Sequence, residues 1–215
     1  MERHILPNAP EELLPDTSAS VADPEQPAWR EQWADLGLPQ SLVDFLVDHR
    51  TVNGTATMLI DTDRCTGCDD CVQACASTHG GKPRLKRHGP IHENIQITNA
   101  CMHCADPVCL IGCPTGAIHR HETGPVVIDD ATCIGSGTCA NSCPYDNISM
   151  VEIRDRPGAF IVDEGEREPI VKATKCDLCF DQLGGPACQR ACPHDALLRV
   201  DMRDHQTLAQ RVNRS

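Results

Sequence analysis

Cysteine spacing constrains this chain of 215 residues more than any other feature of its sequence. Fifteen cysteines fall into four short motifs. The motifs read Cys65-x2-Cys68-x2-Cys71-x3-Cys75, Cys101-x2-Cys104-x4-Cys109-x3-Cys113-Pro114, Cys133-x5-Cys139-x3-Cys143-Pro144 and Cys176-x2-Cys179-x8-Cys188-x3-Cys192-Pro193. The third motif has Ser136 at the place where the pattern calls for a cysteine. The chain is therefore expected to fold around four compact sites built from thiolates, one of which differs from the others.

The spacing within each motif has a physical basis in iron–sulfur chemistry. A cubane cluster needs one thiolate on each iron, and an x2 spacing lets a tight loop wrap one cluster with three of them. The x3-Cys-Pro ending typically begins a helix, so the fourth thiolate points away and ligates a neighbouring cluster. Soft thiolates select iron–sulfur clusters, zinc or copper(I) over hard cations. The motifs thus predict iron–sulfur clusters with cysteine ligands.

Disulfides and structural zinc are the two alternatives. Disulfides fit poorly because fifteen is odd, no secretory signal is evident, and three-residue spacings within single turns give poor disulfide geometry. Zinc would accept the Cys-x2-Cys pairs alone. Zinc ribbons, however, do not repeat a three-plus-one pattern with proline after the last cysteine. Iron–sulfur clusters are the favoured interpretation.

Composition agrees with a core that metal helps to hold together. Only three Phe, one Tyr and two Trp are present, so bound clusters would replace part of the missing hydrophobic burial. The formal net charge of −12 argues against a nucleic-acid-binding role. No run of about eighteen apolar residues exists, and the first residues do not resemble an export signal. We expect a cytoplasmic protein that would meet a membrane only through a partner.

The N-terminal region differs from the rest of the chain. Residues 1–28 are rich in Pro, Glu and Asp and predict a linker or disordered arm. Trp29, Trp33 and Leu36 are spaced for one helical face. A second short amphipathic helix is predicted after Pro39 from Leu42, Val43, Phe45, Leu46 and Val47. These helices either pack onto the chain's own cluster-binding region or dock a larger subunit, and the sequence leaves both alternatives open.

Strand patterns recur beside the cysteine motifs. Residues 56–61 predict a strand that runs into the first motif, and residues 126–130 predict another before the third. Each later Cys-Pro is followed by a short turn and an apolar residue, at Ile118, Ile148 and Leu197. This internal repeat indicates ferredoxin half-units.

The order in which the half-units pair follows from the connections. Only nineteen residues separate Cys113 from Cys133, and they hold a Gly-Pro turn and a strand, so the second and third motifs predict one two-cluster ferredoxin. The first and fourth motifs then pair across it. The alternative, first with second and third with fourth, leaves longer irregular connections such as 152–175. We therefore favour one ferredoxin module inserted into another.

The predicted fold class is α+β. It consists of nested bacterial-ferredoxin-like modules, with short strands and helices around four iron–sulfur clusters, and an irregular N-terminal arm. The predicted boundaries are 1–54 for an arm that docks a partner, 55–97 with 151–202 for the outer module, 98–150 for the inner module, and 203–215 for a C-terminal tail.

Residues 55–202 resemble the four-cluster iron–sulfur subunits of dimethyl-sulfoxide-reductase-type enzymes, which include those of nitrate reductases, formate dehydrogenases, polysulfide reductases and some hydrogenases. The resemblance is carried by Lys175-Cys176-Asp177-Leu178-Cys179, the long loop to Cys188, and Cys192-Pro193. That family nests its modules in the way inferred above. The first fifty residues are not covered, and many relatives carry a C-terminal membrane helix that this sequence does not contain.

The resemblance implies a ligand set for each cluster, with iron bound through the cysteines. The implied sets are Cys65, Cys68, Cys71 and Cys192 for cluster 1; Cys176, Cys179, Cys188 and Cys75 for cluster 2; Cys101, Cys104, Cys109 and Cys143 for cluster 3; and Cys133, Cys139 and Cys113, with Ser136 at the open corner, for cluster 4.

The open corner bears on the type of the fourth cluster. With three thiolates, a cluster tends to lose the unligated iron and become 3Fe-4S. Serine binds iron poorly at neutral pH because its hydroxyl is far more basic than a thiol, although ligation as an alkoxide would retain a fourth 4Fe-4S cluster. We expect three 4Fe-4S clusters and one 3Fe-4S cluster of higher potential. A cysteine-to-serine change introduced by design would look the same in the sequence.

Other polar residues carry weaker signals. His103 and His194 lie next to cysteines and are candidates for tuning potentials through hydrogen bonds. The basic segment (Lys82, Arg84, Lys86, Arg87 and His88) is interpreted as a solvated loop or as an electrostatic dock for an acidic carrier. Phosphate-binding, flavin, nicotinamide and Ser/His/Asp signatures are absent from the sequence.

The sequence and the resemblance together predict a non-catalytic subunit that relays single electrons. The implied catalytic partner is a molybdenum or tungsten pterin enzyme or a nickel–iron hydrogenase, and the other partner is a quinone-linked membrane anchor, a cytochrome or a soluble carrier. Two alternatives remain, a free polyferredoxin carrier and an iron–sulfur redox sensor. Four sites argue against a sensor, which needs only one labile cluster, and the tryptophan-bearing arm favours a fixed subunit over a free carrier.

Overall fold

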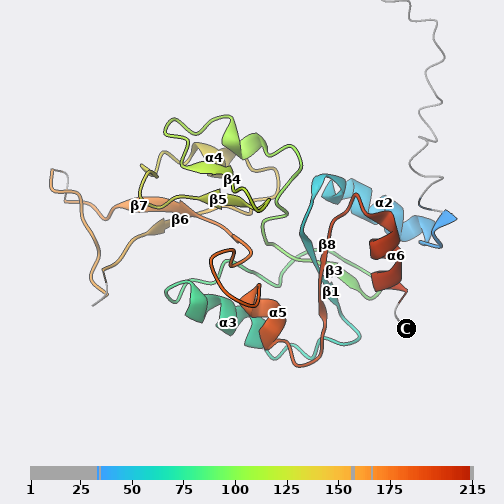
Figure 1. Ribbon diagram of the computed structural model, residues 1–215. Coiled ribbons are helices and arrows are strands. Elements are labelled where there is room, and N and C mark those ends of the chain that lie inside the picture. The colour runs from blue at the N-terminus through green and yellow to red at the C-terminus, as the bar shows by residue number, and fades with distance from the viewer. Residues whose placement is uncertain (1–32, 34, 156–157, 166, 214–215) are drawn as a thin grey trace, which may run out of the picture.

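Short helices and small antiparallel sheets make up the part of the chain that the computed structural model describes, namely residues 33, 35–155, 158–165 and 167–213 (Figure 1). The predicted α+β class is confirmed. The predicted linker over residues 1–28, and Trp29 with it, lies outside the described residues.

The elements are short, as expected for a chain divided by turns around its cysteine motifs. The helices are α2 (Gln40–Asp48), α3 (Asp70–Thr78), α4 (Thr138–Ser142), α5 (Ala187–Ala191) and α6 (His205–Val212), with 3-10 turns η2 (Thr51–Asn53) and η3 (Val108–Leu110). The strands are β1 (Thr57–Asp61), β2 (Ile91–His92), β3 (Ile95–Ile97), β4 (Ile118–Arg120), β5 (Val126–Ile128), β6 (Ser149–Glu152), β7 (Val171–Thr174) and β8 (Leu197–Val200). The two predicted strands correspond to β1 and β5.

A four-stranded antiparallel sheet in the order β2-β3-β1-β8 joins distant parts of the chain. Strand β1, which leads into the first cysteine motif, pairs with β8, which follows the last one, so that Leu59 lies opposite Leu198. Figure 1 shows the two strands side by side, one near each end of the colour scale. Helices α3 and α5 also pack against each other. The first and last cysteine motifs are therefore neighbours in space.

The alternation of side chains along β1 divides them between two cores. Leu59 packs with the apolar faces of α2 and α6, whereas Met58 and Ile60 pack with cysteines of the first and last motifs. Because successive residues of a strand point to opposite faces, one strand supports both cores. Residues 57–60 are consequently all buried.

Helix α2 packs on this sheet. Leu42, Val43 and Leu46 are buried on it, as the amphipathic pattern predicted. Trp33 is buried in the same core, and its Nε1 donates a hydrogen bond to Nε2 of His205 at 2.8 Å. The apolar face of α2 therefore packs within the chain, which is one of the two alternatives that the sequence left open.

The segment predicted as a C-terminal tail, residues 203–215, contains helix α6 at His205–Val212. Asp204 caps this helix by accepting a hydrogen bond from the Thr207 backbone N–H at 3.0 Å. Leu208 and Ala209 are buried against the core that contains Trp33. The segment looked like a tail because so few of its residues are apolar.

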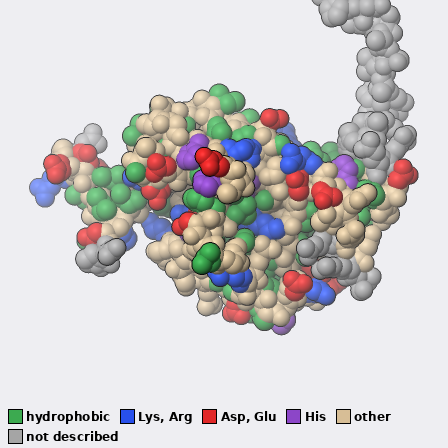
Figure 2. Space-filling model, in the orientation of Figure 1, with side chains coloured by type: hydrophobic (Ala, Val, Ile, Leu, Met, Phe, Trp, Pro, Cys, Tyr) green, Lys and Arg blue, Asp and Glu red, His purple; other side chains and the backbone are tan. Residues whose placement is uncertain are grey.

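Two smaller ladders complete the fold. Strands β4 and β5 form a hairpin between the second and third motifs, and β6 pairs with β7 in a register that places Met150 opposite Ala173. Isolated bridges, Arg154 with Phe160 and Val162 with Pro169, continue the second ladder outward. The projecting part of this ladder lies at the left of Figure 1, and Figure 2 shows hydrophobic side chains on it. The exposed ones are Phe160, Ile161 and Val162.

Candidate iron–sulfur sites

All fifteen cysteines are free thiols, and those near enough to raise one another's pKa fall into four groups, called thiol groups below. The first thiol group contains Cys65, Cys71 and Cys192. Burial raises the pKa of the Cys71 thiol, the Arg87 guanidinium opposes that rise, and the Cys192 and Cys65 thiolates add to it. Cys68, between Cys65 and Cys71 in the same loop, is exposed. The last cysteine of the fourth motif thus lies with the first motif.

The second thiol group contains Cys75, Cys176, Cys179 and Cys188. Burial raises the pKa of the Cys188 thiol to about 11, the Arg199 guanidinium opposes the rise, and the other three thiolates of the group add to it. Cys75 belongs to the first motif and the other three belong to the fourth. The first and fourth motifs therefore exchange their final cysteines.

The third thiol group contains Cys101, Cys104, Cys109 and Cys143. Burial raises the pKa of both Cys104 and Cys109 to about 11, and nearby Cys101 and Cys143 contribute to each rise. The first three cysteines of the second motif are thus joined by the final cysteine of the third motif.

The fourth thiol group contains Cys113, Cys133 and Cys139. Burial raises the pKa of the Cys139 thiol, and the neighbouring Cys133 and Cys113 thiolates raise it further. Ser136 lines a small cavity together with these three cysteines. Its Oγ accepts a hydrogen bond from Oγ1 of Thr138 at 3.4 Å. The side chain predicted for the open corner therefore faces the same cavity as the three thiols.

Two glycines shape the loop around Ser136. Gly135 and Gly137 both have φ of +73°, a conformation that strains any residue with a Cβ. A Cβ on Gly135 would also lie 2.1 Å from the carbonyl oxygen of Val171, whereas a Cβ on Gly137 would meet nothing within 4 Å. Gly135 is thus required both by its backbone conformation and by its contact with β7.

Replacing Gly135 by alanine is expected to destabilise the fourth thiol group. Gly135→Ala and Gly137→Ala share the left-handed strain of about 1–2 kcal/mol, but only Gly135→Ala adds a clash with backbone. Thermal unfolding and iron content of the anaerobically purified variants measure the difference. Equal losses in the two variants would contradict the contact with Val171.

The donor set fits iron–sulfur clusters. Soft sulfur ligands are gathered in groups of three, four, four and three, with Cys68 in the loop beside the first, and burial keeps several of the thiols protonated in the absence of metal. Metal binding deprotonates such thiols and contributes its free energy to folding. Backbone N–H groups already point at sulfur, from Arg84 to Cys75 Sγ at 3.2 Å and from Ala196 to Cys192 Sγ at 3.4 Å. Hydrogen bonds of this kind tune the potentials of clusters.

The fourth thiol group has a distinct electrostatic environment. Backbone hydrogen bonds, the one from Ile118 foremost, lower the pKa of the Cys113 thiol to about 7. The Oγ1 of Thr115 lies 3.8 Å from its sulfur. A thiolate at Cys113 is therefore favoured by local donors and not by burial.

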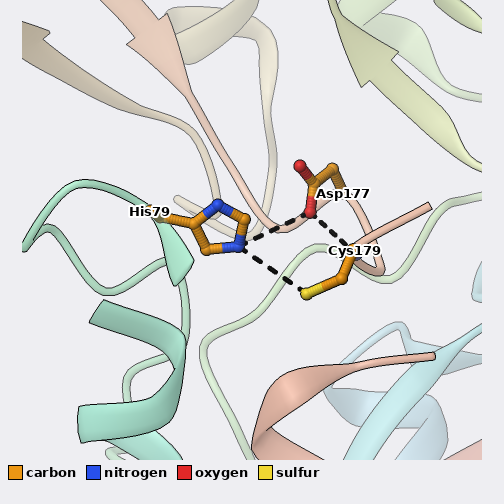
Figure 3. A group of neighbouring side chains, drawn as sticks. All are labelled: His79, Asp177 and Cys179. Carbon is orange, nitrogen blue, oxygen red and sulfur yellow. Dashed lines mark hydrogen bonds and ion pairs between the residues drawn. The ribbon is translucent and has the colours of Figure 1, made fainter. Parts of the chain in front are cut away.

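His79, Asp177 and Cys179 form a cluster of polar side chains beside the second thiol group (Figure 3). Nε2 of His79 lies 3.8 Å from Cys179 Sγ and 3.7 Å from Asp177 Oδ1. Asp177 also accepts the Cys179 backbone N–H at 2.9 Å and pairs with Arg84 at 2.5 Å. Because Cys179 belongs to the second thiol group, the arrangement orients a candidate cysteine ligand of that group.

The sequence did not single out His79 as the neighbour of a ligand, since it lies one hundred residues from Cys179. Burial lowers the pKa of its imidazole, Arg84 lowers it further, and Asp177 opposes both. His79 is therefore a neutral hydrogen-bonding group at neutral pH. The sequence feature that pointed to this place was Asp177, which lies between two cysteines of the motif that follows Lys175.

The two histidines that the sequence did single out differ. His103 is buried, and its Nδ1 accepts a hydrogen bond from the Val126 N–H at 3.0 Å, which places the ring proton on Nε2. Burial first, and then nearby Lys175 and other cations, lower its pKa to about 2. His194 is exposed.

The basic segment is largely paired. Arg84 pairs with Asp177, Arg87 pairs with Asp69 at 2.6 Å, and Nζ of Lys82 donates to the Glu152 carbonyl. Figure 2 shows acidic and basic side chains interspersed over the face drawn, without a patch of one sign. These contacts favour the structural interpretation of the segment over an electrostatic dock.

Family models and curated relatives agree with this donor set. Two models described as 4Fe-4S dicluster domains match residues 93–156 and 125–193. The chain is 32% identical to the B component of anaerobic dimethyl sulfoxide reductase from Escherichia coli over 141 residues, which cover 58% of this chain and 61% of that protein. It is 35% identical over 92 residues to the B component of tetrathionate reductase from Archaeoglobus fulgidus, covering 40% of this chain and 44% of that protein.

A third relative, the B component of anaerobic dimethyl sulfoxide reductase from Haemophilus influenzae, is 36% identical over 104 residues, which cover 40% of this chain and 51% of that protein. The chain thus spans less than two thirds of the length of these curated relatives. Among the helices of the described residues, none has the length and apolar character needed to span a bilayer. The matches and the cysteine motifs together support an iron–sulfur protein, whose residues 93–193 are similar to 4Fe-4S dicluster domains and whose sequence is similar to the B components of anaerobic dimethyl sulfoxide reductases.

Proposed function

We propose that this chain is the non-catalytic subunit that relays single electrons between a catalytic reductase subunit and a second redox partner. The observation that carries the proposal is the exchange of final cysteines between motifs. Cys192 lies with the first motif and Cys75 with the fourth, while Cys143 lies with the second and Cys113 with the third. In a two-cluster ferredoxin, the fourth cysteine of each run ligates the other cluster.

The exchange supports nested modules. We propose an outer module of residues 55–97 with 151–202 and an inner module of residues 98–150. Pairing of β1 with β8 supports the outer module, and the β4–β5 hairpin supports the inner one. The proposed ligand sets are the four thiol groups, with Cys68 completing the first and Ser136 at the open corner of the fourth.

The chain's own residues hold the clusters and shield them. Bound clusters would supply reversible one-electron redox chemistry. The seven buried cysteines keep solvent from the sulfur atoms. Backbone donors such as the Arg84 N–H, and side chains such as His79, place hydrogen-bond donors or dipoles against sulfur. The protein thereby sets the spacing, insulation and potential of each site.

The names of the relatives indicate the partner. They are the B components of dimethyl sulfoxide and tetrathionate reductases, so we propose a molybdopterin reductase as the catalytic subunit. The proposed second redox partner is a quinone-linked membrane anchor, a cytochrome or a soluble carrier. Relatives of this kind do not favour a free carrier or a sensor.

Anaerobic purification from the native host tests the proposal. We expect the chain to co-elute with a larger subunit that contains molybdenum or tungsten, as identified by mass spectrometry and metal analysis. Dithionite-reduced clusters in this complex should reoxidise when the catalytic subunit's substrate is added, and should stay reduced without substrate. Elution of the chain as a free monomer with its full iron content would overturn the proposal in favour of a carrier.

A further inference from the structure

Two basic side chains lie where the second and third thiol groups approach each other. Arg199 is on β8, and Lys175 follows β7 immediately before Cys176. Lys175 is 3% exposed, and the Nε of Arg199 is closed off from solvent.

The Arg199 guanidinium joins the two groups directly. Its Nη2 lies 3.1 Å from Cys176 Sγ, in the second thiol group. Its Nη1 donates to the carbonyl oxygens of Ala56 at 2.7 Å and of Cys101, in the third thiol group, at 3.4 Å. One planar cation therefore contacts a sulfur of the outer module and backbone beside a ligand of the inner module.

Lys175 lies on the other side of the same junction. Its Nζ donates to the carbonyl oxygen of Cys176 at 3.0 Å and to that of Val126, on β5. It is the cation that opposes the effect of burial on the pKa of Cys104 and Cys109. Lys175 therefore acts electrostatically on the third thiol group while it contacts backbone of the second.

These two cations have no carboxylate counter-charge. Within the described residues, the ion pairs of the other basic side chains involve Asp61, Asp69, Asp177, Asp195 and Asp201, and none involves Arg199 or Lys175. The buried His103 nearby is kept neutral, because its Nδ1 accepts the Val126 hydrogen bond. A buried charge without a partner is strongly destabilising. With clusters bound, the cysteine thiolates of the second and third thiol groups would supply the negative charge that balances the two cations.

We propose that Arg199 and Lys175 are positioning residues that raise the reduction potentials of the two clusters at the junction between the outer and inner modules. The proposal rests on the ligand sets put forward above. Reduction adds one negative charge to a cluster, and a nearby cation in a medium of low dielectric constant stabilises that reduced form. Arg199 acts mainly on the cluster of the second thiol group, and Lys175 mainly on that of the third.

Redox titration of the full chain with its clusters, followed by EPR, tests this assignment. In Arg199→Gln and in Lys175→Met, we expect the ratio of oxidised to reduced cluster to rise at least tenfold for one cluster at a fixed applied potential. This corresponds to a fall of about 59 mV in the reduction potential of a one-electron couple. The signals affected should differ between the two variants, and the remaining signals should stay in place. Arg199→Lys and Lys175→Arg should recover most of each shift.

Arg190→Gln is the matched control. Arg190 lies two residues from both Cys188 and Cys192, but it is exposed, and its guanidinium donates a hydrogen bond to the Leu183 carbonyl and contacts no sulfur that the structure describes. Solvent screens its charge, so we expect less than a threefold change in any cluster. Iron content measured in parallel shows that the clusters are retained.

Several outcomes would overturn the inference. One such outcome is that Arg199→Gln and Lys175→Met both keep their full iron content and show unchanged cluster potentials. Another is that Arg190→Gln shifts a cluster potential as much as these two variants do. If Arg199→Gln loses its iron, the other two variants still test the inference. It requires a lowered cluster potential in Lys175→Met and an unchanged cluster potential in Arg199→Lys. Absence of iron from the unaltered chain would instead overturn the proposed function, and the two failures are thereby distinguished.

Discussion

Removing iron from the folded chain is expected to abolish its cooperative thermal transition. Five of the ten buried residues in the core between α3, α5 and the sheet are cysteines, namely Cys71, Cys75, Cys101, Cys176 and Cys188. The free energy of metal binding to such sites contributes directly to folding, and it is about 10–16 kcal/mol for zinc in zinc-finger peptides. Most domains have a total stability of only about 5–15 kcal/mol. The cysteine-lined cores therefore have too little apolar packing to persist without metal.

Removal of iron should destabilise some parts of the chain more than others. The core beneath α2 and α6 contains Trp33, Leu46 and Leu208 among its buried residues and no buried cysteine. We expect amides of α3, α4 and α5 to lose hydrogen-exchange protection after anaerobic chelation, while those of α2 and α6 keep a larger part of it. Adding ferrous iron and sulfide should restore the transition. A chelated chain that unfolds cooperatively at the original temperature would contradict this dependence on metal.

Local patterns in the sequence predicted local structure well. The predicted strand over residues 56–61 and the apolar face of residues 42–47 each correspond to an element that the structure contains, because burial decides such segments. Helix α6 was missed since it buries only Leu208 and Ala209 among its described side chains, too few to produce a visible period. The β6–β7 ladder was missed because β6 is nowhere fully buried.

Long-range contacts were beyond the reach of the sequence. The cysteine spacing indicated which residue types form the sites, because ligand chemistry fixes the spacing. It carried no information on which cations lie between two sites. Arg199 looks like an ordinary residue of a strand, and Lys175 like part of a motif, until the fold places both against Cys176. His79 became a neighbour of Cys179 in the same way.

We propose that the fourth thiol group holds a 3Fe-4S cluster, and replacing Ser136 by cysteine is then expected to convert it to 4Fe-4S. Ser136 already lines the cavity of Cys113, Cys133 and Cys139, so a sulfur at its γ position would supply the missing ligand. Iron should rise from about fifteen to about sixteen ions per chain. The EPR signal of an oxidised 3Fe-4S cluster should disappear, and the potential of this site should fall.

Ser142→Cys is the matched control, because Ser142 belongs to the neighbouring α4 but does not line the cavity and donates its hydroxyl to the Thr138 carbonyl. It should leave both iron content and EPR signal unchanged. Ser136→Ala separates the remaining possibilities. It should match the unaltered chain if the serine is not a ligand, and should lose one iron if the serine binds as an alkoxide. About sixteen irons per unaltered chain, without the EPR signal of an oxidised 3Fe-4S cluster, would rule out that cluster. The fourth iron would then have a ligand other than cysteine.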